Sequence, residues 1–445
     1  VAGNPYRRVS GATPSDPVRQ GESATVIETY GPVLLGLALV FGLFMTWGIG
    51  ANDVANAMGP AVGSGAITMM TALVIAGVFE MAGAVIAGGE VTSTVRSNIV
   101  AVDAFVDAPG QLALGMLSAL LSAGIWLLVA SSRGWPISTT HSIVGSIIGF
   151  ALIAAGVEAV NWGKVGQIAA SWVISPLIGG VIAFALKLSI RHLILQTEQP
   201  VAAARRWGPF YVFLVGFIVS LITLFKGLKH LDLDLTVPES FAWALVIGIG
   251  TAVAGWALIR RVRVDDSDSH DVSVARVERI FTPMMIFTAC AMAFAHGSND
   301  VANGVGPLAA VVSIVTSGGE VATTSGLPVW ILVLGGIGIV VGLGTYGRRV
   351  MRTIGEKLTP LTPNRGFCVT LAASATVVLA SRTGLPVSTT HIAVGAVIGV
   401  GLARAFDQVN FRLFLGIVAS WVLTLPLAAG LAALIYIILR AIFTV

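Results

Sequence analysis

Charged residues are unusually scarce in this sequence. Only 11% of its 445 residues are Asp, Glu, Lys or Arg, against roughly 25% in soluble domains, whereas 56% are hydrophobic and the mean hydropathy is +0.89. Because a bilayer core admits backbone only in fully hydrogen-bonded elements, apolar stretches of spanning length are expected to be helices. The composition therefore excludes an ordinary soluble domain and predicts an all-α integral membrane protein.

Cysteine residues and long polar segments are also scarce. Cys290 and Cys368 both lie in apolar stretches, which excludes a disulfide framework and a metal-thiolate site. The only sizeable polar segments are residues 1–30, 191–208 and 265–271, and none can hold a catalytic domain. The net charge of +4 is explained by Lys and Arg beside the membrane, so it does not indicate nucleic-acid binding. Any activity must therefore lie within the membrane part.

Twelve apolar stretches are close to or above the length needed to cross a bilayer as a helix, roughly 18 to 20 residues. They lie at approximately 31–50, 66–88, 112–131, 141–157, 165–189, 209–226, 239–259, 281–297, 328–346, 366–381, 390–404 and 413–440. We expect about twelve transmembrane helices.

One polar string occurs twice within this apolar sequence, first as GIGANDVANAMGP and then as HGSNDVANGVGP. Its acidic residues, Asp53 and Asp300, are 247 residues apart. The polar members of the two copies are Asn52, Asp53, Asn56, Asn299, Asp300 and Asn303. We call these two segments the Asn-Asp motifs.

A second string is duplicated at nearly the same distance. WPISTTH ends at His141 and LPVSTTH ends at His391, 250 residues later. The hydroxyl residues of these two hydroxyl motifs are Ser138, Thr139, Thr140, Ser388, Thr389 and Thr390. The near-equal offsets indicate that one ancestral half was duplicated whole.

The duplication predicts the domain organisation. We expect a polar N-terminal segment (1–30), a first repeat of five spans (31–190), a linker with two spans (191–280) and a second repeat of five spans (281–445). Equivalent spans are seven crossings apart, and because seven is odd, the repeats should have opposite orientation. Broken or re-entrant helices are expected at the motifs, with the two copies meeting near the midplane.

Loop charges predict the orientation. Most of the 26 Lys and Arg residues fall in loops on one side, which we place in the cytoplasm. Both termini are then outside, and the chain is predicted to be a multi-pass protein of the cell (plasma or inner) membrane. Lys187 and the Arg348–Arg349 pair are interpreted as anchors at span ends.

The Asn-Asp motifs have the chemistry of a cation site. Carboxylate and carboxamide oxygens suit hard cations, and neither motif contains a Lys or Arg to pair with its Asp. The pairs Gly59–Pro60 and Gly306–Pro307 suggest that the helix unwinds there and turns its carbonyl groups inward. The simpler alternative is that Asp and Asn cap broken helices, but two copies in inverted positions favour a functional site.

The hydroxyl motifs have the chemistry of an anion site. In each, a proline precedes Ser and Thr residues that can cap the next helix, and free backbone NH groups at a helix start attract anions. Two such starts facing each other would hold a small tetrahedral oxyanion, although helix capping alone is the alternative. His141 and His391 are either proton-sensitive neighbours of this anion or residues that hydrogen-bond to backbone.

Glu80 is a carboxylate in the middle of an apolar stretch, with no obvious basic partner. A role in binding the coupling ion or a proton is favoured over a structural role.

Two rival activities fit the sequence less well than transport. An intramembrane hydrolase needs one activated serine, not two equal copies, and inverted repeats suit alternating access better than a channel.

These motifs resemble the duplicated signature of the inorganic phosphate transporter (PiT) family, over nearly the whole chain from about residue 31. The resemblance implies twelve spans, external termini, inverted repeats, commonly a homodimer, and phosphate transport coupled to sodium or protons. It implies that the residues of the Asn-Asp motifs form the cation and substrate centre and that the hydroxyl motifs contact phosphate. Glu80, in GVFEMAG, resembles the family's essential first-repeat glutamate, whereas GGIGIVVGLG in the second repeat has no acidic residue.

The sequence thus predicts a secondary transporter, not an enzyme, that imports inorganic phosphate by Na⁺ symport. The expected phosphate ligands are Ser138, Thr139, Thr140, Ser388, Thr389, Thr390, Asn52 and Asn299. The expected Na⁺ ligands are Asp53, Asn56, Asp300, Asn303 and Glu80. The expected partners are phosphate, Na⁺ or H⁺, the lipid bilayer and a second copy of the chain, without nucleic acid and without a cofactor. An H⁺-coupled phosphate or sulfate permease is the alternative.

Overall fold

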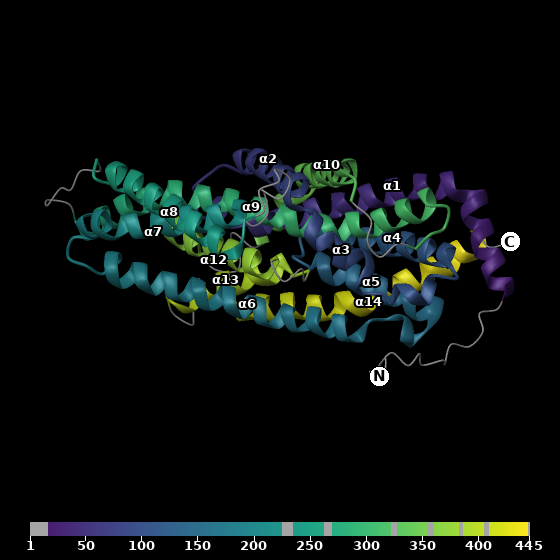
Figure 1. Ribbon diagram of the computed structural model, residues 1–445. Helices are drawn as coiled ribbons and strands as arrows, with labels where there is room; N and C mark the ends of the chain where they lie inside the picture. Colours follow the sequence, from purple (N-terminus) through teal and green to yellow (C-terminus); the bar gives the residue numbers. More distant parts are fainter. Residues whose placement is uncertain are drawn as a thin grey trace, which may run out of the picture.

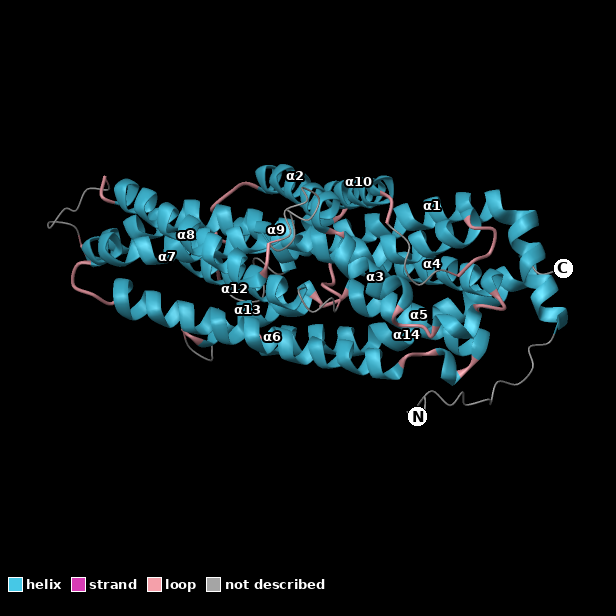
Figure 2. Ribbon diagram, in the orientation of Figure 1, coloured by secondary structure: helices cyan, strands magenta, loops and turns pink. Residues whose placement is uncertain are grey.

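The computed structural model describes residues 17–224, 235–261, 269–321, 327–353, 360–381, 386–404 and 409–443, and this part is almost entirely helical (Figures 1 and 2). The α-helices are α1 (Pro17–Gly63), α2 (Met69–Ala87), α3 (Gly89–Ser97), α4 (Pro109–Arg133), α5 (Thr139–Ala155), α6 (Trp162–Ile190), α7 (Pro200–Ile222), α8 (Val237–Ile259), α9 (His270–Thr316), α10 (Val329–Thr345), α11 (Gly347–Arg352), α12 (Pro363–Ser381), α13 (Thr389–Leu402) and α14 (Phe411–Phe443). An isolated bridge joins Val100 and Val160. The prediction of an all-α membrane protein is confirmed.

Each of the twelve apolar stretches corresponds to one helix, and α3 and α11 are short additional helices. Eight of the described helices are long and apolar enough to cross a membrane: α1, α2, α4, α6, α7, α8, α9 and α14. The apolar helices α5, α10 and α13 are shorter than a full span. The number of crossings, the inverted orientation and the external termini therefore stay predictions.

The predicted domain limits are only partly covered by the structure. Helix α1 already begins at Pro17, within the segment expected to be a polar N-terminal extension, while residues 1–16 lie outside the described part. Most of the acidic segment 265–271 is also outside it. The start of α1 and the end of α14 lie at the same end of the molecule, where the rings of Tyr30 and Phe443 are 5.2 Å apart (Figure 1).

The Asn-Asp motifs do not interrupt their helices. Both α1 and α9 run unbroken for 47 residues, with Pro60 and Pro307 inside them. The expected unwinding at the Gly-Pro pairs is thus wrong, because a proline removes one backbone donor but neighbouring packed elements can still hold the helix together. The interruptions lie at the hydroxyl motifs instead. Helix α4 ends at Gly134, which has a positive φ of 69°, and α5 begins only at Thr139.

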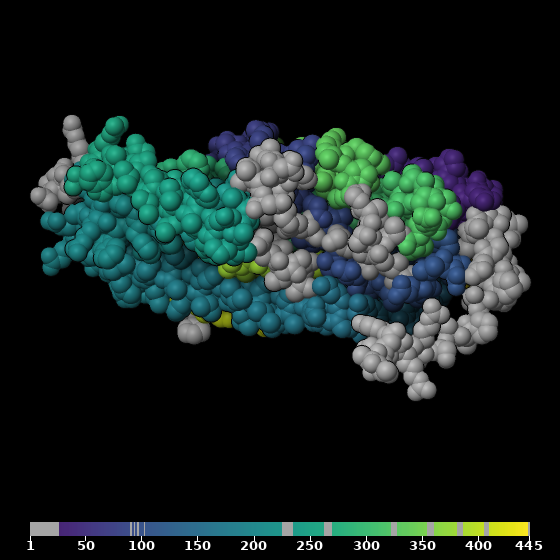
Figure 3. Space-filling view, in the orientation of Figure 1, coloured from purple at the N-terminus to yellow at the C-terminus, as the bar shows by residue number. Residues whose placement is uncertain are grey.

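The two halves make the same packing contacts twice. Helix α1 packs on α4 and α10, and α9 packs on α12 and α2; likewise α5 packs on α14, and α6 on α13. The linking helices α7 and α8 pack on each other. The space-filling view shows α2 and α10 along one edge of the molecule and α6 along the opposite edge (Figure 3). This arrangement encloses the middle of α1 and α9.

Two glycines show which positions in the halves are equivalent. A Cβ atom on Gly50 would collide with the carbonyl oxygen of Ile339, and a Cβ on Gly297 would collide with the carbonyl oxygen of Glu80. Only glycine permits such close approach of two helices. Since Gly50 and Gly297 are themselves equivalent, Glu80 in α2 and Ile339 in α10 occupy corresponding places.

One predicted surface residue is buried. Lys187 is only 5% exposed, and its ammonium group donates to Asn364 Oδ1 at 2.6 Å. Its interpretation as an anchor at the membrane interface is therefore wrong. The side chain ties α6 to α12 because α12 packs against α6 at this level.

Candidate functional site

The Asn-Asp motifs lie in the middle of the molecule, side by side on α1 and α9, which pack on each other. All six side chains are at most 1% exposed. Within each motif the Asp and the second Asn are three residues apart, so they share a helix face. Asn56 Nδ2 is 3.4 Å from Asp53 Oδ1, and Asn303 Nδ2 is 3.5 Å from Asp300 Oδ1.

The hydroxyl motifs start the two inner helices. Ser138 and Ser388 are the N-caps of α5 and α13, and their hydroxyl oxygens accept from His141 N at 3.1 Å and His391 N at 3.2 Å. The capping expected from the sequence is thus present in both copies. It leaves the Thr side chains of the first turn, which are buried, free for other contacts.

The Asn residues reach across to the other half. Asn56 Nδ2 donates to Thr390 Oγ1 at 3.0 Å and to Thr389 Oγ1 at 3.3 Å. In the reverse direction, Asn303 Nδ2 donates to Thr140 Oγ1 at 3.4 Å and to Thr139 Oγ1 at 3.5 Å. Each Asn-Asp motif is therefore connected to the hydroxyl motif of the opposite half, 333 and 334 residues away in the chain for Asn56 and 163 and 164 residues away for Asn303.

The aspartates complete this connection. Thr390 Oγ1 donates to Asp53 Oδ1 at 3.0 Å, and Thr389 Oγ1 donates to Asp300 Oδ2 at 2.6 Å. A hydroxyl bonded to a carboxylate at such a short distance is among the stronger hydrogen bonds in proteins. All four motifs thus form one buried polar cluster, which we call the central cluster.

Several oxygens of the central cluster have no hydrogen-bond partner among the described residues. These are Oδ1 of the four Asn side chains and Oδ2 of Asp53. An unsatisfied buried acceptor costs about 1–3 kcal/mol, so the five together favour a ligand that is a cation or a hydrogen-bond donor. A hard cation is such a ligand, because carboxylate and carboxamide oxygens are its preferred donors.

Asn52 and Asn299 hold the turns that precede the inner helices. Asn52 Nδ2 donates to the carbonyl oxygen of Trp135 at 2.9 Å, and Asn299 Nδ2 donates to the carbonyl oxygen of Val387 at 3.0 Å. Asn299 Nδ2 also lies 2.8 Å from Asp300 Oδ1. Their amide donors are therefore engaged with protein, and the assignment of these two side chains to phosphate stays a prediction.

His296 is the residue of the central cluster that sequence reasoning missed. Its Nε2 is 2.9 Å from Asp300 Oδ2 and 3.9 Å from Asp53 Oδ2, and its Nδ1 is 3.2 Å from Glu80 Oε1. All four side chains are fully buried. Glu80, which seemed to lack a basic partner, is thus adjacent to His296. The signal was in the sequence, because His296 is the first residue of the second Asn-Asp motif.

Part of the cluster has the geometry of an ion site. Asp53, His296 and Asp300 each present one ligand atom, and these atoms lie within 4.8 Å of one another. Glu80 stands on the far side of the imidazole and contacts the aspartates through it. Its expected role as a direct Na⁺ ligand therefore stays a prediction. The arrangement can bind a cation between the aspartates and an oxyanion beside the hydroxyl motifs.

Comparisons with known sequences and structures show the family to which the chain belongs. The sequence profile of the phosphate transporter family matches residues 49–432, which is most of the chain. The chain belongs to the phosphate transporter family. As a member of this family it is a multi-pass membrane transporter and not an enzyme, and the resemblance to the PiT family is confirmed.

Individual relatives cover nearly the whole length. A putative phosphate permease of Haemophilus influenzae is 47% identical over 94% of this chain and 99% of its own, and a putative phosphate permease of Pyrococcus abyssi is 43% identical over 91% and 97%. The chloroplastic inorganic phosphate transporter 2-1 of Arabidopsis thaliana is 40% identical. A solved structure, described as the sodium-dependent phosphate transporter, superposes with a TM-score of 0.84 at 40% identity, covering 92% of this chain and 100% of that one.

Proposed function

We propose that this protein imports inorganic phosphate together with Na⁺ by alternating access, with one site at the interface of two inverted repeats. The observation that supports this most is the crossed bonding, in which Asn56 and Asn303 each bind the hydroxyl motif of the other half. A site that joins both halves senses their relative movement. Transporters built from repeats place substrate and ion at such a seam.

In this proposal the aspartates bind the coupling ion. Asp53 and Asp300, with the oxygens of Asn56 and Asn303, take Na⁺, and Glu80 supports the site through His296. The unsatisfied oxygens of these Asn side chains and of Asp53 favour a cation there. The dependence on sodium named for the solved relative points to the same ion.

Phosphate takes the other part of the cluster. The hydroxyl groups of Ser138, Thr139 and Thr140, with those of the equivalent Ser388, Thr389 and Thr390, surround it together with the starts of α5 and α13. Asn52 and Asn299 orient the turns from which these helices begin. No Lys or Arg belongs to either motif, so Na⁺ offsets the phosphate charge, and binding of both ligands favours the state that opens to the other side.

The remaining features are also proposals. We place the protein in the plasma or inner membrane with both termini outside, as a homodimer in the lipid bilayer, and without an organic cofactor. Protonated phosphate can donate a hydrogen bond to a buried aspartate, whereas sulfate cannot do so at neutral pH. This difference favours phosphate over sulfate.

A second candidate is H⁺-coupled transport of the same substrate. The observation in its favour is the buried Glu80–His296 pair, since both side chains can carry a proton and their nearest atoms are 3.2 Å apart. In that case Asp53, Asp300, Glu80 and His296 would together pass the proton through the site. The anion would still lie between the hydroxyl motifs.

Uptake by proteoliposomes tests the proposal. Labelled phosphate is measured with an imposed Na⁺ gradient and, separately, a pH gradient, each with excess sulfate as competitor. Accumulation driven by Na⁺ and unaffected by sulfate is expected. Accumulation driven only by the pH gradient would replace Na⁺ by H⁺, inhibition by sulfate would reject the phosphate preference, and no accumulation under either gradient would reject symport.

A further inference from the structure

Four aromatic rings lie in a row across the seam between the halves, with angles between successive ring planes of 43°, 69° and 21°. The order is Trp172, His141, His391 and Trp421, and the rings come from α6, α5, α13 and α14. The ring centroids are 3.8 Å apart for Trp172 and His141, 4.5 Å for the two histidines, and 3.7 Å for His391 and Trp421. Each ring is less than 9% exposed. We call this group the ring stack.

The histidines of the ring stack also make crossed hydrogen bonds. His141 Nδ1 is 3.1 Å from the carbonyl oxygen of Trp421, and His391 Nδ1 is 3.0 Å from the carbonyl oxygen of Trp172. A carbonyl oxygen only accepts, so each Nδ1 carries the hydrogen and donates. The bond of His141 thus joins α5 of the first half to α14 of the second half. The bond of His391 joins α13 of the second half to α6 of the first half.

These bonds act on the residues that surround the anion. His141 and His391 lie in the first turn of α5 and α13, and their backbone NH groups are capped by Ser138 and Ser388. The same turns carry the Thr hydroxyls of the central cluster. Trp421 Nε1 donates in addition to the carbonyl oxygen of Pro136, in the turn before α5. Movement of either imidazole therefore moves one set of hydroxyl groups relative to the other.

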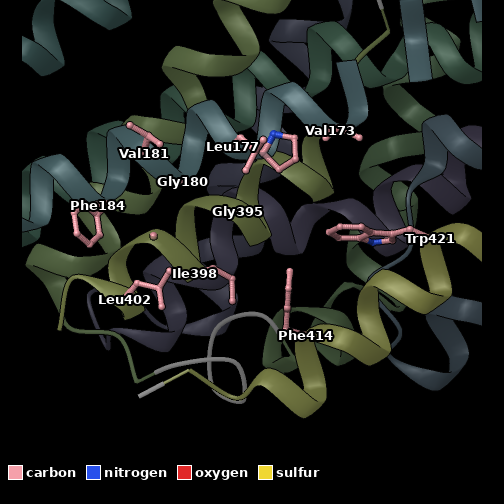
Figure 4. A pocket seen from close by; sticks show the side chains of 12 residues that line it. Val173, Leu177, Gly180, Val181, Phe184, Gly395, Ile398, Leu402, Phe414 and Trp421 are labelled. Atoms are coloured by element: carbon pink, nitrogen blue, oxygen red, sulfur yellow. The ribbon is translucent and has the colours of Figure 1, made fainter. Parts of the chain in front are cut away.

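The ring stack has free space on one side. An open apolar groove of about 420 Å³ lies between α6, α13 and α14, and Trp421 borders it together with the exposed Val173 and Leu177 (Figure 4). Trp421 thus contacts both this groove and the ring of His391. Because the described residues leave Trp421 open to this groove, the contacts that hold the rings are those to each other and to the crossed carbonyl groups.

We propose that His141 and His391 are positioning residues, which hold the two hydroxyl-bearing helix starts at the separation that phosphate requires. This inference rests on the proposed binding of phosphate between those helix starts. The donor that matters is Nδ1, because it makes the bond to the opposite half.

The test compares two substitutions of similar size. In His391→Asn the amide nitrogen occupies the place of Nδ1, so the bond to Trp172 can form; in His391→Gln the amide lies one bond further out, and the Nδ1 donor is lost. We expect about tenfold weaker phosphate binding for His391→Gln, the loss of one hydrogen bond, and at most about threefold for His391→Asn. His141→Asn and His141→Gln should behave in the same way.

Binding of labelled phosphate to the purified full chain in detergent with Na⁺ gives the affinity, and uptake by proteoliposomes gives KM and the maximal rate. The expected result is a raised KM with a maximal rate within about twofold of the unsubstituted protein. Trp126→Phe is the matched control, since Trp126 Nε1 donates to Thr424 Oγ1 of the other half at 3.0 Å but lies outside the ring stack. It should leave phosphate affinity unchanged.

Three outcomes would overturn the inference: unchanged phosphate affinity in His391→Gln, equal weakening in His391→Asn and His391→Gln, or a reduced maximal rate with unchanged KM. Failure of the proposed function is seen separately, in the unsubstituted protein. If that protein binds phosphate but does not accumulate it under a Na⁺ gradient, symport is rejected while the Asn and Gln variants still test positioning. If it binds no phosphate, both proposals fall.

Discussion

The two flanks of the central cluster are equivalent in backbone but opposite in chemistry. On the α2–α9 flank, Glu80 and His296 form a buried polar pair beside Asp300. On the α1–α10 flank, the corresponding positions are occupied by Ile339 and Ile49, both fully buried. The duplicated ancestor gave both flanks the same helix packing, so the polar pair, with Glu80 from the first half and His296 from the second, is a property of one flank only. The cluster therefore contains this pair once, although it contains the aspartate twice.

The largest expected effect comes from removing an aspartate. Asp300→Asn keeps the shape but removes the carboxylate that binds His296 and accepts from Thr389. Loss of one partner of a buried pair costs about 3–5 kcal/mol, so we expect coupled uptake to fall by at least about 100-fold. Asp53→Asn should lower uptake nearly as much. The measurement is the initial rate of Na⁺-driven phosphate uptake, with gel filtration to show that the variants fold. Normal uptake in Asp53→Asn would contradict the proposed mechanism.

Placing a charge on the apolar flank should destabilise the protein. Ile339→Glu puts a carboxylate at the position equivalent to Glu80 but without a histidine beside it. An unpaired buried charge costs several kcal/mol, so the yield of monodisperse protein and its melting temperature in detergent should fall. Adding Ile49→His supplies the missing partner and should recover part of this loss. Equal stability of Ile339→Glu and the unsubstituted protein would show that the two flanks are not equivalent.

Removing the charge from the polar flank should have a smaller effect on transport. Glu80→Gln preserves volume but takes away the carboxylate next to His296. We expect about a tenfold lower uptake rate, because a hydrogen bond to a charged group contributes about 1.5–3 kcal/mol and the glutamine retains part of it. Uptake driven by a pH gradient and by a Na⁺ gradient should be compared. A loss confined to the pH gradient would assign the pair to proton transfer and leave Na⁺ binding to the aspartates.

The smallest predicted effect is a difference in apparent Na⁺ affinity between variants of Asn52 and Asn299, the first Asn of each Asn-Asp motif. Asn299 contacts Asp300 as well as a backbone carbonyl, whereas Asn52 contacts Ser131 and a backbone carbonyl. Asn299→Ala should therefore weaken the apparent Na⁺ affinity by about tenfold, the loss of one charge-assisted bond, and Asn52→Ala by about threefold or less. Uptake at graded Na⁺ concentrations gives both values. A larger effect of Asn52→Ala would indicate that the α1–α10 flank binds the ion more strongly.

The residues of the central cluster could be predicted from the sequence because they are polar, duplicated and surrounded by apolar chain. Asp53, Asn56, Thr389 and Thr390 stand out for these reasons, and the structure brings them together. The continuity of α1 beyond Pro60 could not be predicted in this way. A Gly-Pro pair favours a break locally, and only the packing of neighbouring helices decides whether the break occurs.

His296 shows a different limit. A comparison of the two repeats reveals only the residues that both contain. The first repeat has Ile49 at the position equivalent to His296, so the comparison does not identify the histidine as a site residue. The hydrogen bonds of Asn56 and Asn303 to the opposite half could likewise not be predicted, because the spacing of motifs along a chain does not determine which copies contact each other. Both features depend on how α1, α9, α5 and α13 pack.

The contacts of Gly50 and Gly297 have a consequence for how the molecule can move. Where a helix backbone touches a carbonyl group of its neighbour directly, neither can slide along the other without a collision. Helix α2 must then travel with α9, and α10 with α1, as two rods fixed at one point. We expect Glu80 to stay beside His296 when the halves move, while the crossed bonds between the motifs lengthen. We therefore expect the boundary between the two moving bodies to run through the central cluster and not between the repeats defined by the sequence.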